Sequence, residues 1–131
     1  QMLKAEGLAN AIERHFLMRD MVRGGLQALG LEMLVQDESV ASSTVTAVLG
    51  GQLDISKFRR IAEEEFGYIL AGGQGHLKDT TFRIGHMGYM MPGEMLGLLS
   101  IVELALHRAG LPINLGQGVQ KAQGIYLAKV Q

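Results

Sequence analysis

The sequence of 131 residues contains no cysteine. This absence excludes disulfide bonds, a thiolate nucleophile and any metal cluster held by cysteine ligands within the sequence. A protein without cysteine is compatible with a reducing compartment, and we expect a cytoplasmic location.

Tryptophan is also absent, aromatic residues make up only 5% of the sequence, and the net charge is −1. A stacking surface for single-stranded nucleic acid needs aromatic side chains, and an interface with nucleic acid or an anionic membrane needs clustered positive charge. Charged residues or glycines interrupt every apolar stretch before it reaches the length of a membrane span. The sequence therefore predicts neither a nucleic-acid partner nor a membrane partner.

What the sequence does contain is enough apolar material for a packed core, with 47% hydrophobic and 19% charged residues. The length fits one domain, which we assign to residues 1–131. Apolar residues recur at helical spacing through Leu8, Ile12, Phe16 and Val22, and this spacing predicts a long helix over residues 1–30. No capping residue precedes that helix, so we expect it to lead in from another part of a longer protein.

Shorter patterns divide the remaining chain into strands and helices. β-branched and apolar runs predict strands at residues 31–35, 44–49, 67–71 and 80–85. Helical patterns follow at residues 54–66 and 93–108, with a weaker one at 114–129 that several glycines interrupt. This order predicts an α+β fold, a small and largely antiparallel sheet with helices on one face.

The glycines of Gly72-Gly73-Gln74-Gly75 could expose backbone N–H groups to a phosphate. No helix follows directly, and neither a Walker pattern nor a dinucleotide fingerprint is complete. The run alone favours a glycine-rich hairpin loop.

Arg83 is the stronger candidate for a binding residue. Strand alternation places Phe82 and Ile84 on one face, which reads as core, and Arg83 on the other, between Thr81 and Gly85. Small neighbours leave space around the guanidinium, whose fork matches a carboxylate bidentately. Two interpretations follow from this local pattern: a surface arginine paired with a nearby acid, or a carboxylate-binding arginine.

Histidines flank the same strand at His76 and His86. No carboxylate or third histidine shares a metal-ligand spacing with them, so the sequence predicts no metal site. Lys78, in a polar turn, reads as an exposed lysine.

Three segments together resemble a known family. The run A-G-G-Q-G-H-L-K at 71–78, the run F-R-I-G-H-M-G at 82–88 and the strand at 41–48 resemble the class V aminotransferases. That family uses pyridoxal phosphate and includes the alanine–glyoxylate and serine–pyruvate aminotransferases. Asp79-Thr80-Thr81 departs from many relatives, so contacts of that loop are not carried over.

The resemblance implies a fold type I subunit with a large and a small domain, of which this chain matches only the C-terminal small domain. Residues 1–30 would be the helix that leads in from the missing large domain. In that family the large domain supplies the lysine that links to pyridoxal phosphate and most of the phosphate contacts. None of the lysines of this chain lies in that context, so no catalytic or cofactor-binding residue is expected here; they are Lys4, Lys57, Lys78, Lys121 and Lys129.

At the position of Arg83 the family has an arginine that grips the substrate carboxylate. The implied function is the transfer of an amino group from a small amino acid, alanine or serine, to a 2-oxo acid, glyoxylate or pyruvate. The implied partners are the chain's own large N-terminal domain and a second subunit in a homodimer, and the fragment alone would be inactive. The alternatives are a free-standing α+β module that binds a small carboxylate or amino acid, and a structural interaction domain with no ligand.

Overall fold

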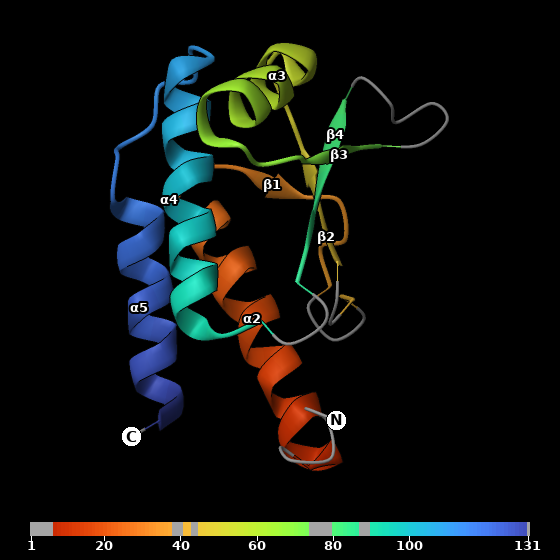
Figure 1. Cartoon of the computed structure of the whole chain (residues 1–131), viewed down its shortest axis with the longest axis vertical. Helices are drawn as coiled ribbons and strands as arrows, with labels where there is room; N and C mark the ends of the chain where they lie inside the picture. Colours follow the sequence, from red (N-terminus) through yellow and green to blue (C-terminus); the bar gives the residue numbers. More distant parts are fainter. Residues whose placement is uncertain (1–6, 38–40, 43–44, 74–79, 87–89, 131) are drawn as a thin grey trace.

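The fold comes from a computed structural model that describes residues 7–37, 41–42, 45–73, 80–86 and 90–130 (Figure 1). The elements in chain order are α2 (Leu8–Ala28), β1 (Glu32–Met33), β2 (Val45–Leu49), α3 (Ile55–Phe66), β3 (Ala71–Gly72), β4 (Thr81–Gly85), α4 (Pro92–Arg108) and α5 (Gln117–Val130).

The strands form one antiparallel sheet in the order β1-β2-β4-β3. β4 therefore lies inside the sheet, where Arg83 pairs with Ala47 of β2 on one side and with Ala71 of β3 on the other. This confirms the predicted small antiparallel sheet.

The helices cover one face of this sheet. Figure 1 shows α2, α4 and α5 together on one side of the strands. α3 reaches the same face, because the rings of Phe58 and Phe82 lie 4.8 Å apart between centroids. The core between the layers includes Met18, Met21, Val22, Leu26, Phe58, Phe82, Ile84, Leu99, Val102 and Leu106. The predicted α+β architecture is confirmed.

α2 begins after Gly7 and ends before Gly30, whose φ of 92° stops the helix as predicted. Residues 1–6, the start of the predicted helix, lie outside the described part of the chain. The apolar pattern along α2 does not form a single buried face. Val22 and Leu26 are fully buried, but Leu8, Ile12 and Phe16 remain 66%, 47% and 42% exposed, because the core lies only beneath the second half of the helix.

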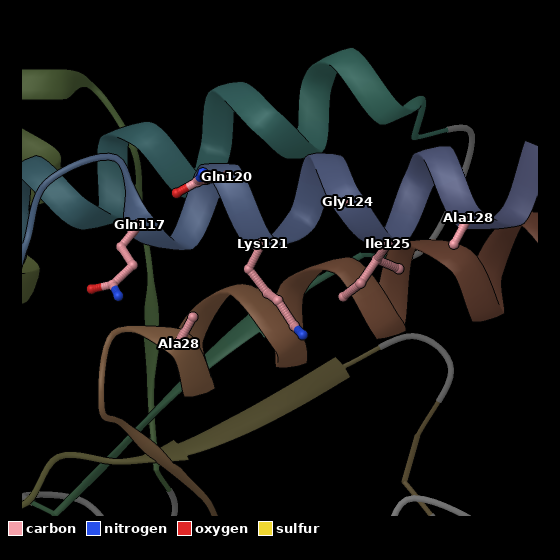
Figure 2. A pocket seen from close by; sticks show the side chains of 7 residues that line it. All are labelled: Ala28, Gln117, Gln120, Lys121, Gly124, Ile125 and Ala128. Atoms are coloured by element: carbon pink, nitrogen blue, oxygen red, sulfur yellow. The ribbon is translucent and has the colours of Figure 1, made fainter.

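α5 is a full helix, although its glycines predicted a weak one. At its start Gly118 lies against α2, and a Cβ there would come within 2.9 Å of the Gly25 carbonyl oxygen. On α2 a Cβ at Gly24 would come within 2.4 Å of Ile125. Figure 2 shows Lys121, Ile125 and Ala128 of α5 along this same contact with α2. The glycines thus allow two helices to approach closely, which outweighs their low helix propensity.

The third strand is shorter and later than predicted, at Ala71–Gly72 instead of 67–71. Gly67 has a φ of 68° and ends α3, so the chain cannot enter the sheet immediately. The Leu70 carbonyl accepts a hydrogen bond of 2.6 Å from Arg59 Nε of α3. That segment is therefore tied to the helix before it joins the sheet.

Within the described residues, none of the helices has the length and apolar character needed to cross a membrane.

Candidate functional site

Arg83 lies on the sheet face that the helices leave open. Its neighbours Phe82 and Ile84 are fully buried beneath the helices, whereas Arg83 itself is half-buried on the opposite side. The alternation predicted from the sequence is confirmed for these three residues. Both cross-strand neighbours of Arg83 are alanines, Ala47 and Ala71, so only methyl groups flank its long side chain.

One hydrogen bond orients the guanidinium. Arg83 Nε donates to the Gly72 carbonyl oxygen of β3 at 2.9 Å. Within the described part of the chain, neither terminal nitrogen, Nη1 or Nη2, has a hydrogen-bond partner. Two parallel donors on a side chain already oriented by its third donor form a fork that a carboxylate can accept.

The guanidinium opens into a hollow of about 320 Å³. The described residues that line it are Val45, Tyr68, Ile69, Leu70, Ala71, Arg83 and Gly85, of which Arg83 alone is charged. Partial burial raises the pKa of the Tyr68 phenol above its ordinary value of 10.0, so this residue is neutral at physiological pH. Among the described lining residues, Arg83 therefore supplies the one positive charge, beside mostly aliphatic side chains and the neutral Tyr68 phenol.

Of the two flanking histidines only His86 is described, and it does not line the hollow. His86 is fully buried, and its Nε2 is hydrogen-bonded to Thr46 Oγ1 at 2.9 Å beneath the sheet. His76 and Lys78, with the end of the glycine run at Gln74 and Gly75, lie outside the described residues. In the described ranges, no group of three or more histidine, aspartate or glutamate side chains could hold a metal ion.

The described lysines offer no attachment point for pyridoxal phosphate at the hollow. That cofactor is held through a lysine in enzymes that use it as an electron sink. Among the described lysines, Lys57, Lys121 and Lys129 are all exposed, and none lines the hollow.

Comparison with known proteins shows which family the chain resembles. No protein-family model matches the chain. It is 35% identical over 122 residues to an uncharacterized aminotransferase of Methanocaldococcus jannaschii, a match that covers 93% of this chain and 31% of that protein. It is 36% identical over 118 residues to serine–glyoxylate aminotransferase of Arabidopsis thaliana, covering 89% of this chain and 29% of that one. The crystal structure of pyridoxamine–pyruvate aminotransferase from Mesorhizobium loti superimposes with a TM-score of 0.90 at 29% identity, over 98% of this chain and 33% of the other.

This chain belongs to the class V aminotransferases. The resemblance seen in the two glycine-containing motifs is thereby confirmed. The chain spans about a third of the length of the curated aminotransferases that it matches.

Sequence reasoning missed one buried acid of this aminotransferase chain, Glu103. Its carboxylate is only 3% exposed and accepts hydrogen bonds from the backbone N–H groups of Gly116 and Val119, the latter at 2.8 Å. Glu103 of α4 therefore caps the start of α5 and satisfies two donors that a helix leaves open. The signal was its position on the apolar stripe of α4, beside Val102 and four residues after Leu99.

A second unpredicted pair joins α3 to the end of α4. Arg108 donates from Nε and Nη2 to the two carboxylate oxygens of Glu65, at 3.0 and 2.5 Å. The hydrogen bond from Arg108 holds the pKa of Glu65 below its ordinary value of 4.5. Both side chains are exposed, so the pair adds little to stability.

Proposed function

We propose that residues 1–131 are the C-terminal small domain of a pyridoxal-phosphate-dependent class V aminotransferase, and that Arg83 binds the carboxylate of its amino-acid and 2-oxo-acid substrates. The observation that carries this proposal is the guanidinium of Arg83, which is oriented by the Gly72 carbonyl and has both terminal nitrogens turned to no described partner. A bidentate ion pair fixes the carboxylate in direction as well as in position.

The role of Arg83 is to position the substrate. A carboxylate held at two points cannot rotate freely, so the carbon next to it is presented in one orientation to groups outside the hollow. A large domain that covers the exposed walls of the hollow would keep water away from the ion pair and strengthen it. This role is one of positioning and not of proton transfer.

The cofactor and the catalytic lysine belong to the rest of the protein in this proposal. Bound pyridoxal phosphate supplies an electron sink for the amino-group carbon. The described lysines of this chain are exposed and away from the hollow, which supports a cofactor site in a large N-terminal domain. We extend the proposal to a homodimeric, cytoplasmic enzyme of that two-domain type.

The exposed apolar face of α2 supports a large domain as partner. Leu8, Ile12 and Phe16 recur every four residues and are each more than two-fifths exposed. Side chains at this spacing share one helix face. A contiguous apolar face of this kind marks a contact surface, and α2 is the helix that would lead in from the large domain.

The proposed substrates are small: alanine or serine as donor, and glyoxylate or pyruvate as acceptor. Serine–glyoxylate and pyridoxamine–pyruvate aminotransferases are among the proteins that the chain resembles. The first is named for glyoxylate and the second for pyruvate, the two proposed acceptors. A hollow of about 320 Å³ with one charged group suits small monocarboxylic acids.

Substitution of Arg83 in the full-length protein tests the proposal. Arg83→Ala should weaken the binding of alanine and serine by about 2–4 kcal/mol, because a desolvated ion pair is lost. Arg83→Lys should recover only part of this affinity, since an ammonium keeps the charge without the fork. Equilibrium titration with each amino acid gives the affinities, and the visible absorbance of bound pyridoxal phosphate reports cofactor occupancy.

Arg60→Ala is the matched control, because Arg60 is exposed on α3 and does not line the hollow. Equal amino-acid affinity in wild type, Arg83→Ala and Arg60→Ala would show that Arg83 has only a structural role.

A free-standing carboxylate-binding module is the alternative. It would need only the fork of Arg83, which the Gly72 carbonyl of this chain already orients. A full-length protein that binds small carboxylates through Arg83 but never binds pyridoxal phosphate would support this alternative.

A further inference from the structure

Next to the fork of Arg83, three residues from β2, β4 and the segment before β3 form a row along the hollow. Val45 of β2 pairs with Gly85 of β4 in the antiparallel register. Ile69 lies on the other side of β4, two residues before β3 begins at Ala71, which pairs with Arg83. Val45, Gly85 and Ile69 all line the hollow that contains Arg83.

Gly85 leaves the middle of this row open. A Cβ built at Gly85 would meet no heavy atom within 4 Å among the described residues. The backbone of Gly85 is not in the left-handed region, so a larger side chain would cause no backbone strain there. Glycine in a strand forgoes packing, and such positions often mark the close approach of a ligand.

The two walls of the row are aliphatic. Val45 is half-buried, and Ile69 is 76% exposed, the largest exposure of any large hydrophobic side chain in the described residues. An isoleucine in this position gains free energy when another apolar group covers it. The walls, the open floor and the adjacent guanidinium together match an aliphatic chain attached to a carboxylate.

We propose that Val45, Gly85 and Ile69 form a slot for the aliphatic part of a carboxylate ligand held by Arg83, and that Gly85 sets the length that the slot admits. The inference rests on the proposed role of Arg83. It assigns the ligand class as monocarboxylic acids with short aliphatic chains. A second carboxylate placed against Val45 or Ile69 would lose its hydration without gaining a cationic partner from the described lining residues.

Equilibrium binding of acetate, propionate, butyrate and valerate to the full-length protein, measured by calorimetry, tests this slot. Gly85→Val should leave acetate binding unchanged and weaken butyrate and valerate about tenfold to a hundredfold, because its side chain takes the space of one or more methylene groups. Ile69→Ala, at an exposed position, should weaken the longer acids without affecting acetate. Gly97→Val, an identical change on α4 in equally open space outside the hollow, should alter none of the four affinities.

The outcomes distinguish a failure of the slot from a failure of the proposed carboxylate-binding role of Arg83. If Gly85→Val weakens all four acids equally, or none of them, the slot is wrong even though Arg83 keeps its role. If Arg83→Ala changes no affinity, the proposed function itself fails. If Gly85→Val does not fold, Gly85→Ala replaces it and should likewise weaken the longer acids more than acetate. The slot is wrong if neither Gly85→Ala nor Ile69→Ala changes the affinity for the longer acids relative to acetate.

Discussion

Arg83 and Glu103 are two charged side chains with opposite arrangements. Arg83 uses Nε to bind the Gly72 carbonyl, and its two terminal nitrogens, which have no partner among the described residues, form the proposed binding site. Both carboxylate oxygens of Glu103, in contrast, accept hydrogen bonds from backbone N–H groups at the start of α5. We therefore propose a binding role for Arg83 and a stabilising role for Glu103.

Removal of the Glu103 carboxylate should destabilise the protein without affecting ligand binding. Glu103→Ala leaves the N–H groups of Gly116 and Val119 without their acceptor, which costs about 1–3 kcal/mol. Denaturant unfolding of wild type and variant measures this change. Glu64→Ala, at an exposed position of α3, is the control and should be near neutral. Equal stability of the two variants would contradict the capping role.

Part of the site could be predicted from the sequence because it depends on local alternation. The face of Arg83 follows from its neighbours Phe82 and Ile84 in β4. The orienting bond to Gly72 and the acceptor role of Glu103 could not be predicted in this way, because each joins groups more than ten residues apart along the chain. The family motif indicated that Arg83 is a binding residue, but not what holds it in place.

The long elements follow from periodicity, and the short ones do not. α3 covers Ile55–Phe66, close to the predicted 54–66; Asp54 Oδ1 caps its start by accepting from the Lys57 N–H at 3.1 Å, and Gly67 caps its end. β3 was misplaced because two residues carry too little pattern to set a strand's bounds. α5 was predicted to be weak because glycine has a low helix propensity. Helix propensity does not include the close packing of α5 against α2 that its glycines allow.

Two glycines of α5 should respond in opposite ways to the same substitution. Gly118→Ala places a methyl group within 3 Å of the Glu103 carboxylate and the Gly25 carbonyl and should cost about 1–3 kcal/mol. Gly124→Ala meets no described heavy atom within 4 Å and should stabilise the protein by about 0.5–1 kcal/mol through helix propensity. Thermal or denaturant unfolding gives both values. An equal change in stability at both positions would contradict the predicted effect of the close contact at Gly118.

At the scale of the whole molecule, the chain is a compact α+β unit with two surfaces open to a partner. One is the sheet face that carries Arg83, and the other is the half of α2 that exposes Leu8, Ile12 and Phe16. The α+β architecture was predictable because helices and strands follow each other in a pattern that only a layered arrangement buries. The division of α2 into a buried and an exposed half was not predicted, although the six-residue step from Phe16 to Val22 departs from the four-residue spacing of Leu8, Ile12 and Phe16.

The chain matches about a third of each curated relative, so the proposed reaction has to be tested in the full-length protein. The most direct test of the proposed function is amino-group transfer by the full-length protein loaded with pyridoxal phosphate. Alanine or serine serves as donor and glyoxylate or pyruvate as acceptor, and the amino acid formed is quantified by chromatography. The 131-residue chain alone, given the same cofactor, is the matched comparison.

We predict transfer by the full-length protein and none by the chain alone. A cofactor-loaded full-length protein that transfers no amino group between any of these pairs would contradict the proposed reaction, and transfer by the chain alone would contradict the placement of the catalytic lysine outside it.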